Sequence, residues 1–419
     1  MLRPSRLKWI GTVVLSLAAC SPAAWGKTLV VGAPNTPCPN AEYTTIGAAV
    51  KAADSGDEIK VCPALYPEQI VINKRMTLTG IAENGVSRVL IQPTSFAAPT
   101  LPAPVGTLPF IAVISVVNAH GVTISNLVID GSNNNVSGCT TPFADIHYYN
   151  SSGTVDKVAL SGSQLQDQSS CTALFPGNGF GMQVDTAAGV SASYSVTVQD
   201  SSIYGFGRDG ILVSGSTETV QISGNTIAGT GPSTGVNQFG VFLANGAKGQ
   251  VTGNQISQGT CGSIAIPDCF SLRSEGIVLR AVGDGVVVSG NTITNVQAGV
   301  FVNGATHVVV SENLISNVDA LSGMQIQGSI GGLFTLNRIV HVGPLTTDTS
   351  NDEEGCGIND ISGTGSADNV IAANRISDAY CGVGYVSGDQ LERNSYVNTL
   401  YETLNGDDYP NTFPPPVEP

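Results

Sequence analysis

The chain has 419 residues, of which 50 are glycine and only 12% are charged. This composition is unusual for a helical protein and typical of a chain with many short strands and tight turns. The 17 basic and 32 acidic residues give a net charge of −15, so nucleic acids and anionic membrane surfaces are poor partners.

Residues 1–26 have the pattern of an export signal. Three basic residues precede an apolar stretch, 9–19, that is too short to span a membrane. The stretch ends in Leu17-Ala-Ala-Cys20, which resembles the lipobox of bacterial lipoproteins and implies acylation of Cys20. Ordinary signal cleavage after Gly26 is the alternative. Both predict an exported protein, which touches a membrane only if it carries a lipid anchor.

Residues 27–80 are predicted to form an N-terminal cap and a first coil. Apolar side chains recur at helical spacing over 43–53, so a short helix is expected there. Strands are expected over 28–31, 58–61, 69–72 and 76–80. A helix at this point would cover the apolar core at the end of a repeat structure.

Residues 81–404 repeat a short motif, the Asn phrase, as in Val220-Gln-Ile-Ser-Gly-Asn-Thr-Ile227. Its positions are an apolar residue, any residue, an apolar residue, a small residue, any residue, Asn, any residue, and Ile or a similar residue. Its asparagines are Asn225, Asn254, Asn291, Asn313, Asn337, Asn374 and Asn394. A unit of about 20 to 24 residues with insertions predicts a solenoid. We expect these side chains to stack as a hydrogen-bonded ladder, which is a structural role. Leu127, Ser163 and Ser201 are expected at the same position in earlier coils.

The start of this region carries a family resemblance. Tyr43-Thr-Thr-Ile46, Gly56-Asp57 and Leu65-Tyr-Pro-Glu-Gln69, each in its place among the predicted strands, resemble the N-terminus of the pectin-lyase-like superfamily, especially of pectin methylesterases. The resemblance implies an all-β fold, a right-handed parallel β-helix of about ten three-strand coils with a short N-terminal capping helix.

The catalytic motifs of that superfamily's enzymes are missing. Gln166-Asp167 lacks the residues that follow it in methylesterases, and no Asp-Phe-Ile-Phe-Gly motif occurs. The single Asp-Asp pair, Asp407-Asp408, falls in the Pro-rich segment 405–419, which is expected to be a tail without ordered elements. The resemblance therefore predicts the fold and not one activity.

The nine cysteines fit an exported protein, because eight remain once either cleavage removes Cys20. Cys356 and Cys381 each precede the Gly-apolar start of a strand in consecutive coils, which places them about 4.8 Å apart, within disulfide reach. Sequential pairing predicts the bridges Cys38–Cys62, Cys139–Cys171, Cys261–Cys269 and Cys356–Cys381, in an oxidising compartment. Metal binding is the alternative, although no Cys-x-x-Cys spacing supports it.

The long insertions indicate a binding face. They cover 131–145, 167–179, 229–238, 257–274 and 341–355, and each comes just before a Gly-apolar strand. Loops on one edge are expected to wall a groove along the sheet of these strands. The second and fourth residues after each glycine should face that groove, where aromatic and amide side chains suit sugars. The candidate binding residues are Tyr149, Gln183, Phe242, Arg280, Phe301 and Gln325. Ordinary surface residues are the alternative.

Two sets of residues are candidates for catalysis. Asp209 and Glu275 precede the glycines of strands two coils apart, so their backbones should lie about 9.6 Å apart. Side chains could then reach the roughly 6.5–9.5 Å carboxyl separation of inverting glycosidases. His147, with Asp145 and Asp185, is a second acid–base cluster. Local hydrogen bonds to backbone N–H groups are the alternative role for the carboxylates.

The remaining histidines, His120, His307 and His341, are expected in turns. Asp352-Glu-Glu354 is a candidate Ca²⁺ site, with a solvated acidic loop as the alternative. The sequence thus predicts a polysaccharide as partner. It leaves two classes of function open. The protein is either a polysaccharide lyase or glycosidase, or a non-catalytic cell-surface protein with a binding, adhesion or structural role.

Overall fold

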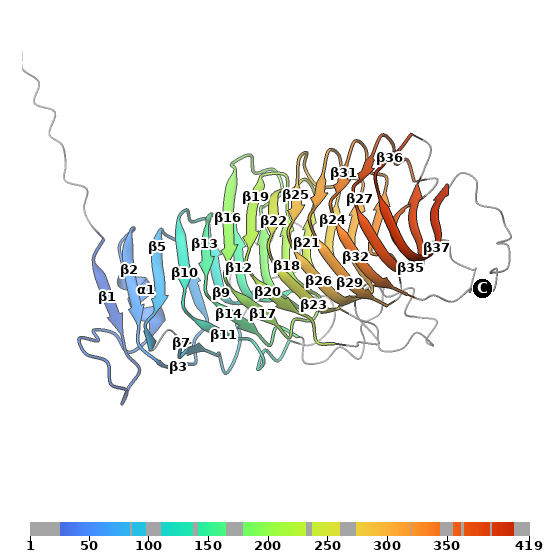
Figure 1. Ribbon diagram of the computed structural model, residues 1–419. Helices are drawn as coiled ribbons and strands as arrows, with labels where there is room; N and C mark the ends of the chain where they lie inside the picture. Colours follow the sequence, from blue (N-terminus) through green and yellow to red (C-terminus); the bar gives the residue numbers. More distant parts are fainter. Residues whose placement is uncertain are drawn as a thin grey trace, which may run out of the picture.

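The structure, a computed structural model, describes residues 26–83, 86–97, 110–136, 141–164, 179–231, 237–259, 274–319, 321–343, 355–361, 364–385 and 388–405. Within these ranges the chain winds through three strands and three turns, over and over, and each strand pairs in parallel with its counterparts in the neighbouring coils. The coils stack into a long rod, with β1 (Thr28–Val31) at one end and β37 (Ser395–Asn405) at the other (Figure 1).

Face 1 is the sheet that precedes the Asn turn in each coil. It contains β1, β2 (Asp57–Val61), β5 (Met76–Gly80), β10 (Val122–Ser125), β13 (Gly153–Asp156), β16 (Tyr194–Gln199), β19 (Glu218–Ser223), β22 (Lys248–Thr252), β25 (Val287–Ser289), β28 (Val309–Ser311), β31 (Leu333–Thr335), β34 (Val370–Ala372) and β36 (Gln390–Glu392).

Face 2 follows the Asn turn. It contains β3 (Ala64–Tyr66), β8 (Val89–Ile91), β11 (Val128–Asp130), β14 (Ala159–Ser161), β17 (Ser202–Tyr204), β20 (Thr226–Ala228), β23 (Gln255–Gly259), β26 (Thr292–Val296), β29 (Leu314–Val318) and β32 (Arg338–Val342). A two-stranded antiparallel sheet of β6 (Ala82–Glu83) and β7 (Val86–Ser87) lies between β5 and β8 in the chain.

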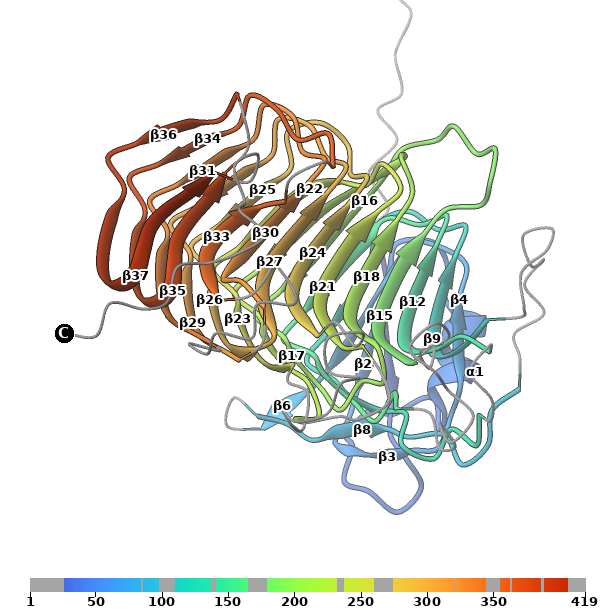
Figure 2. The same cartoon turned by 90° about the vertical axis from the view of Figure 1, so that its right-hand side faces the viewer.

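Face 3 holds the Gly-apolar strands, which lie side by side in chain order in Figure 2. It contains β4 (Ile70–Ile72), β9 (Ile111–Val117), β12 (Phe143–Tyr149), β15 (Gly179–Asp185), β18 (Asp209–Ser214), β21 (Phe239–Ala244), β24 (Glu275–Arg280), β27 (Ala298–Asn303), β30 (Met324–Gln327) and β33 (Cys356–Asp360). The long strands β35 (Arg375–Tyr385) and β37 run through both face 2 and face 3. All five predicted insertions connect face 2 to face 3.

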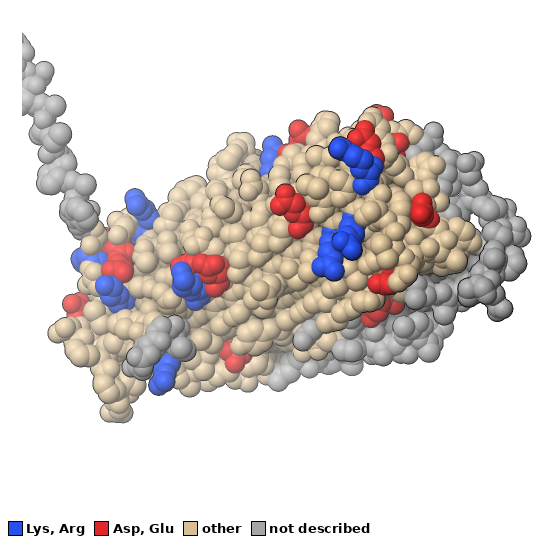
Figure 3. All heavy atoms as spheres, in the orientation of Figure 1, with Lys and Arg blue, Asp and Glu red and all other residues tan. Residues whose placement is uncertain are grey.

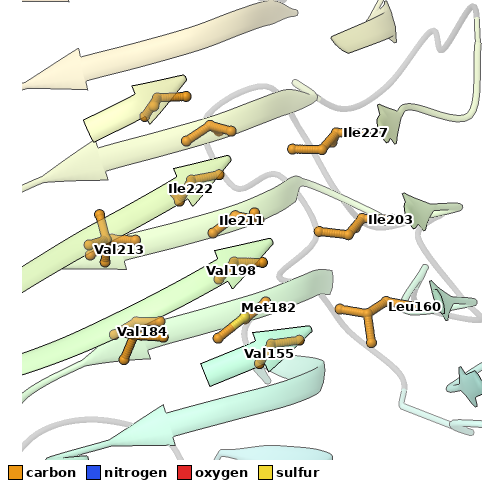
Figure 4. Packing of buried hydrophobic residues seen from close by; sticks show 14 of the residues in the cluster. Val155, Leu160, Met182, Val184, Val198, Ile203, Ile211, Val213, Ile222 and Ile227 are labelled. Carbon is orange, nitrogen blue, oxygen red and sulfur yellow. The ribbon is translucent and has the colours of Figure 1, made fainter. Parts of the chain in front are cut away.

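The core is a column of aliphatic side chains that point inward from all three faces. Figure 4 shows one part of it, with Val198 of face 1, Ile203 of face 2 and Val213 of face 3 directed into the interior. Isoleucine and valine suit these strands because β-branched side chains pack well on a pleated surface. Since every coil buries the same positions, the period of the sequence phrase becomes the period of the rod.

The Asn phrase forms the predicted ladder at the turn from face 1 to face 2. Asn291 illustrates it: its Oδ1 accepts from the backbone N–H (2.9 Å) and Nδ2 (3.0 Å) of Asn254. Its Nδ2 donates to Asn313 Oδ1 at 2.9 Å and to the Val251 carbonyl at 2.9 Å. The ladder begins with the Ser201 N–H, which donates to Asn225. Ser163 was assigned wrongly, because the pairing of Ala159 with Ser202 places Val158 at this position.

The helix near the N-terminus is α1 (Ile46–Ala52), which buries Ile46, Ala49 and Val50. Its first turn is held by a residue of the Tyr-Pro-Glu motif, since the Glu68 carboxylate accepts from the Ile46 and Gly47 N–H groups, each at 2.8 Å. Among the described residues, no helix is both long and apolar enough to cross a membrane.

Two predicted disulfides are present. Cys38 is bonded to Cys62, and Cys356 is bonded to Cys381 with a Cα–Cα distance of 4.4 Å, close to one strand spacing. The other predicted pairs, and Cys20 and the segment 406–419, lie outside the described residues. Strand β37 continues through Asn405, one residue into the predicted tail.

Replacing Cys356 and Cys381 together by alanine is expected to lower the free energy of unfolding by about 3 kcal/mol. The bridge closes a loop with a sequence separation of 25. Its loss raises the conformational entropy of the unfolded chain, which favours unfolding. Urea unfolding measures the change, with Ser377→Ala on the same strand as the control. An unchanged midpoint in the double variant would contradict the prediction.

Candidate active site on face 3

From β15 to β33, a glycine stands near the start of each face 3 strand because there is no room for a side chain. A Cβ on Gly240 would collide with Ile256 and with the Gly276 carbonyl of the next coil. After the glycine the side chains alternate. Val241 and Leu243 belong to the core, whereas Phe242 and Ala244 belong to a separate outer cluster. The predicted outward direction of the second and fourth residues is therefore correct.

Strand pairing lines these outward residues up in three rows. The entry row contains Ala144, Phe180, Asp209, Phe239, Glu275 and Ala298, and each member after Ala144 precedes a glycine. The middle row contains His147, Gln183, Leu212, Phe242, Val278, Phe301 and Gln325. The outer row contains Tyr149, Asp185, Ser214, Ala244, Arg280, Asn303 and Gln327.

The expectation that these rows lie open in a groove was wrong for most of their members. Phe242 (5% exposed), Phe301 (2%) and Gln325 (0%) are buried, and so are Tyr149 and Gln183. The physical reason is that the aromatic and aliphatic members pack on one another as a second apolar cluster outside the solenoid core. Arg280 and part of Asp185 remain accessible to solvent.

His147 and Asp185 form a close pair on neighbouring strands. His147 Nε2 lies 2.6 Å from Asp185 Oδ1, and the second carboxylate oxygen accepts from Gln183 Nε2 at 3.0 Å. The Phe110 ring stacks on the imidazole with 3.9 Å between ring centroids. The imidazole is 2% exposed, whereas the Asp185 side chain is 24% exposed. This arrangement can accept or pass on a proton at the surface.

Asp145, the third member expected near His147, lies elsewhere. It takes the place that glycine holds in later strands, opposite Gly181, because Ala144 pairs with Phe180 and Ile146 with Met182. Neither of its carboxyl oxygens is hydrogen-bonded to His147. Complete burial raises the pKa of Asp145 well above its ordinary value, and the charge of Asp130 raises it further.

Asp209 is a fully buried acid in the entry row. It pairs in register with Phe180 on one side and Phe239 on the other. Burial raises the pKa of Asp209 to about 7, and the positive charges of Arg208 and Arg280 oppose that rise. Arg208 Nε lies 3.8 Å from Asp209 Oδ2. At neutral pH a large share of this carboxyl group is therefore protonated, as a general acid requires.

Glu275 occupies the same row two strands away and is also buried. Phe239 stands between the two acids, which keeps the backbones about 9.6 Å apart at the usual strand spacing. On the outer row of the Glu275 strand, the Arg280 guanidinium lies 5.5 Å from the centre of the Phe242 ring. An exposed arginine held over an aromatic ring can bind a carboxylate.

Glu218 was not predicted as a site residue, although it lies beside this region. It begins strand β19 on face 1, is buried, and accepts a hydrogen bond from Thr186, the residue after Asp185. Burial raises the pKa of Glu218 to about 7, and the charge of Asp185 raises it further. No motif marks it, because its burial depends on the turn of the preceding coil.

Among the described residues, no group of three or more His, Cys, Asp or Glu side chains could hold a metal ion. The candidate Ca²⁺ segment 352–354 lies outside those residues.

Of the other histidines, His341 was wrongly expected in a turn. It lies within β32, at a bend with a φ of 56°. On the side of the rod in Figure 3, charged groups are sparse and scattered.

No protein-family model matches the sequence, and no curated protein matches it. Several solved structures, in contrast, are similar to this chain. The GH136 lacto-N-biosidase from Eubacterium ramulus has 10% sequence identity and a TM-score of 0.56, over 89% of this chain and 68% of that one. The mannuronan C-5 epimerase A-module from Azotobacter vinelandii has 12% identity and a TM-score of 0.48, over 85% and 91% of the two chains.

Together with the parallel sheets, the similarity to the lacto-N-biosidase defines the fold class of the protein. It is an all-β protein with a parallel β-helix fold. The parallel β-helix predicted from the Asn phrase and the N-terminal motifs is thus confirmed.

Proposed function

We propose that this chain is an exported saccharide-processing protein whose reacting groups lie on face 3. The observation that carries the proposal is Asp209, a buried carboxyl group with a pKa of about 7 in an outward row of that face. Such a group can protonate the oxygen of a glycosidic bond at neutral pH. A lacto-N-biosidase of the same fold supports a saccharide as the substrate class.

The other candidates take roles around this acid. Glu275 is the second carboxylate, which in an inverting hydrolase activates water. The His147–Asp185 pair is the base for a β-elimination, in which it would remove a proton from the sugar ring. Arg280 binds the carboxylate of an acidic sugar. Gln183 donates to Asp185, the Tyr149 ring lies beside the His147 ring, and the Arg280 guanidinium lies over the Phe242 ring. Phe301 packs in the same cluster as Phe242, and Gln325 follows it in the middle row.

Export is part of the proposal. The Cys38–Cys62 and Cys356–Cys381 disulfides are typical of an oxidising compartment. Acylation of Cys20 and ordinary cleavage after Gly26 give mature proteins of different mass, so an intact-mass measurement distinguishes them.

A non-catalytic saccharide-binding protein is the second candidate. It is favoured by the burial of Asp209 and Gln325, both 0% exposed, which leaves Asp185 and Arg280 as the charged members of the three rows that a glycan can reach. In that case the buried acids contribute to the packing of face 3, and the outer row binds a saccharide without turnover.

The test is a panel of neutral and acidic polysaccharides, with and without Ca²⁺. New reducing ends report hydrolysis, and ultraviolet absorbance of unsaturated uronates reports elimination. Asp209→Asn is expected to reduce hydrolysis at pH 7 by about 100-fold or more. His147→Gln should do the same to elimination.

Asp284→Asn is the matched control, since this acid is exposed and lies on a turn outside the rows of face 3. Turnover that survives Asp209→Asn and His147→Gln excludes the assigned roles. Binding without turnover by the wild-type protein establishes the second candidate instead.

A further inference from the structure

A second polar column runs along the end of face 2, before the turn into face 3. It consists of one residue per coil in the left-handed conformation, and its members are Asn295, Asn317, His341, Asp378 and Asn398, with φ between 53° and 56°. Each bends its strand just before an inward residue such as Val318 or Val342. Side chains therefore stack outward at the end of face 2.

Asp378 contacts the column members in the coils on both sides of it. Asn398 Nδ2 donates to Asp378 Oδ1 at 2.9 Å, and His341 Nε2 lies 3.5 Å from Asp378 Oδ2. Asn317 Nδ2 donates to the Thr294 hydroxyl at 3.4 Å. These contacts hold donors and acceptors in a fixed order, one coil spacing apart.

The column borders a pocket of about 370 Å³. Its polar wall is made by Asn295, Asn317, Asp319, His341 and Asp378. Val318 and Val342 also line it, and both belong to the solenoid core. The volume lies within the roughly 300–1,000 Å³ of small-molecule sites, near the lower end.

Asp319 gives the pocket an unused acceptor. Its Oδ1 is buried and has no hydrogen-bond partner, although its backbone N–H is bonded to the Val296 carbonyl at 3.0 Å. Burial raises the pKa of Asp319 to about 6, so the group is mostly ionised at pH 7.5. A buried carboxylate oxygen without a partner is costly, and a donor from a ligand would remove that cost.

We propose that this pocket binds a neutral sugar residue, with Asp319 and Asp378 accepting from its hydroxyls and Asn295, Asn317 and His341 hydrogen-bonding around it. The valines offer an apolar surface to the C–H groups of the ring. The two carboxylates disfavour a uronate by like-charge repulsion. The choice of a sugar among hydroxyl-rich ligands rests on the proposed function, but no residue of the face 3 rows lines the pocket.

The experiment uses the full chain at pH 7.5, with cellobiose, lactose and N,N′-diacetylchitobiose as neutral probes and digalacturonate as the acidic one. Saturation-transfer NMR and titration measure binding. At least one neutral probe is expected to bind, about tenfold more weakly in Asp319→Ala. His341→Gln, a change at an exposed position, should also weaken it and serves if Asp319→Ala does not fold.

The exposed control Asp284→Asn should leave this affinity unchanged. The proposal is overturned if no neutral probe binds, if digalacturonate competes equally for the pocket, or if Asp185→Asn alone abolishes binding. Loss of polysaccharide turnover in the Asp209 variant bears on the proposed function and not on this pocket, so the two can fail separately.

Discussion

Replacement of Asn291 by alanine is expected to lower the free energy of unfolding by about 3 to 5 kcal/mol. The side chain is 1% exposed and occupies the middle of the ladder. Its removal leaves the Asn254 N–H and Nδ2 without their acceptor and the Val251 carbonyl without its donor. Each orphaned buried group costs about 1–3 kcal/mol, because water cannot replace the lost partner.

Urea unfolding followed by circular dichroism measures this loss. Gln221→Ala is the matched control, because Gln221 is an exposed amide on face 1 outside the ladder, and its change should stay within about 0.5 kcal/mol. Hydrogen exchange should accelerate first in the coils on either side of Asn291. Equal stability of the two variants would show that the ladder contributes little.

The stability of the protein is expected to fall as the pH rises from about 4 to about 7, and Asp209→Asn should remove part of that slope. Asp209 has a pKa of about 7 in the folded state against an ordinary value of 3.8. The folded state thus binds more protons than the unfolded state in this window, so raising the pH favours unfolding. The contribution is on the order of 2–4 kcal/mol.

Urea midpoints at pH 5 and pH 8 for the two proteins test the sign. The asparagine variant should lose less stability between these values than the wild type does. Asp200→Asn is the control, since Asp200 is an exposed carboxylate on a turn. Glu218 and Asp360 have folded-state pKa values of about 7 and about 8, so they keep some of the slope in every variant. A steeper slope in Asp209→Asn would contradict the assignment.

Much of the fold could be predicted because the solenoid is nearly one-dimensional. Each coil contacts only its neighbours, so a repeated phrase fixes both the inward positions and the alignment of successive strands. That alignment correctly paired Cys356 with Cys381 and placed Asp209 and Glu275 in one row. The Ser163 assignment was wrong because the phrase lacks its asparagine in that coil, so the sequence alone does not set the alignment there.

The candidate site was predicted less well. Alternation along a strand gives the direction of a side chain, but its burial depends on what packs over it. Phe242, Phe301 and Gln325 point outward as predicted and are nevertheless buried. The pocket beside His341 had a signal in the sequence, since Ile293-Thr-Asn-Val296, Ile315-Ser-Asn-Val318 and Ile339-Val-His-Val342 repeat a polar residue before valine.

The sequence by itself determined the parallel β-helix, the Asn ladder and the rows of face 3, because these follow from a local period that each coil repeats. Only the tertiary structure decided which acids are shielded from water, as Asp209 and Glu218 are, and which oxygen of Asp319 is left without a donor. The physical reason is that a pKa and a pocket depend on neighbours from other coils and faces, whose approach no single coil encodes.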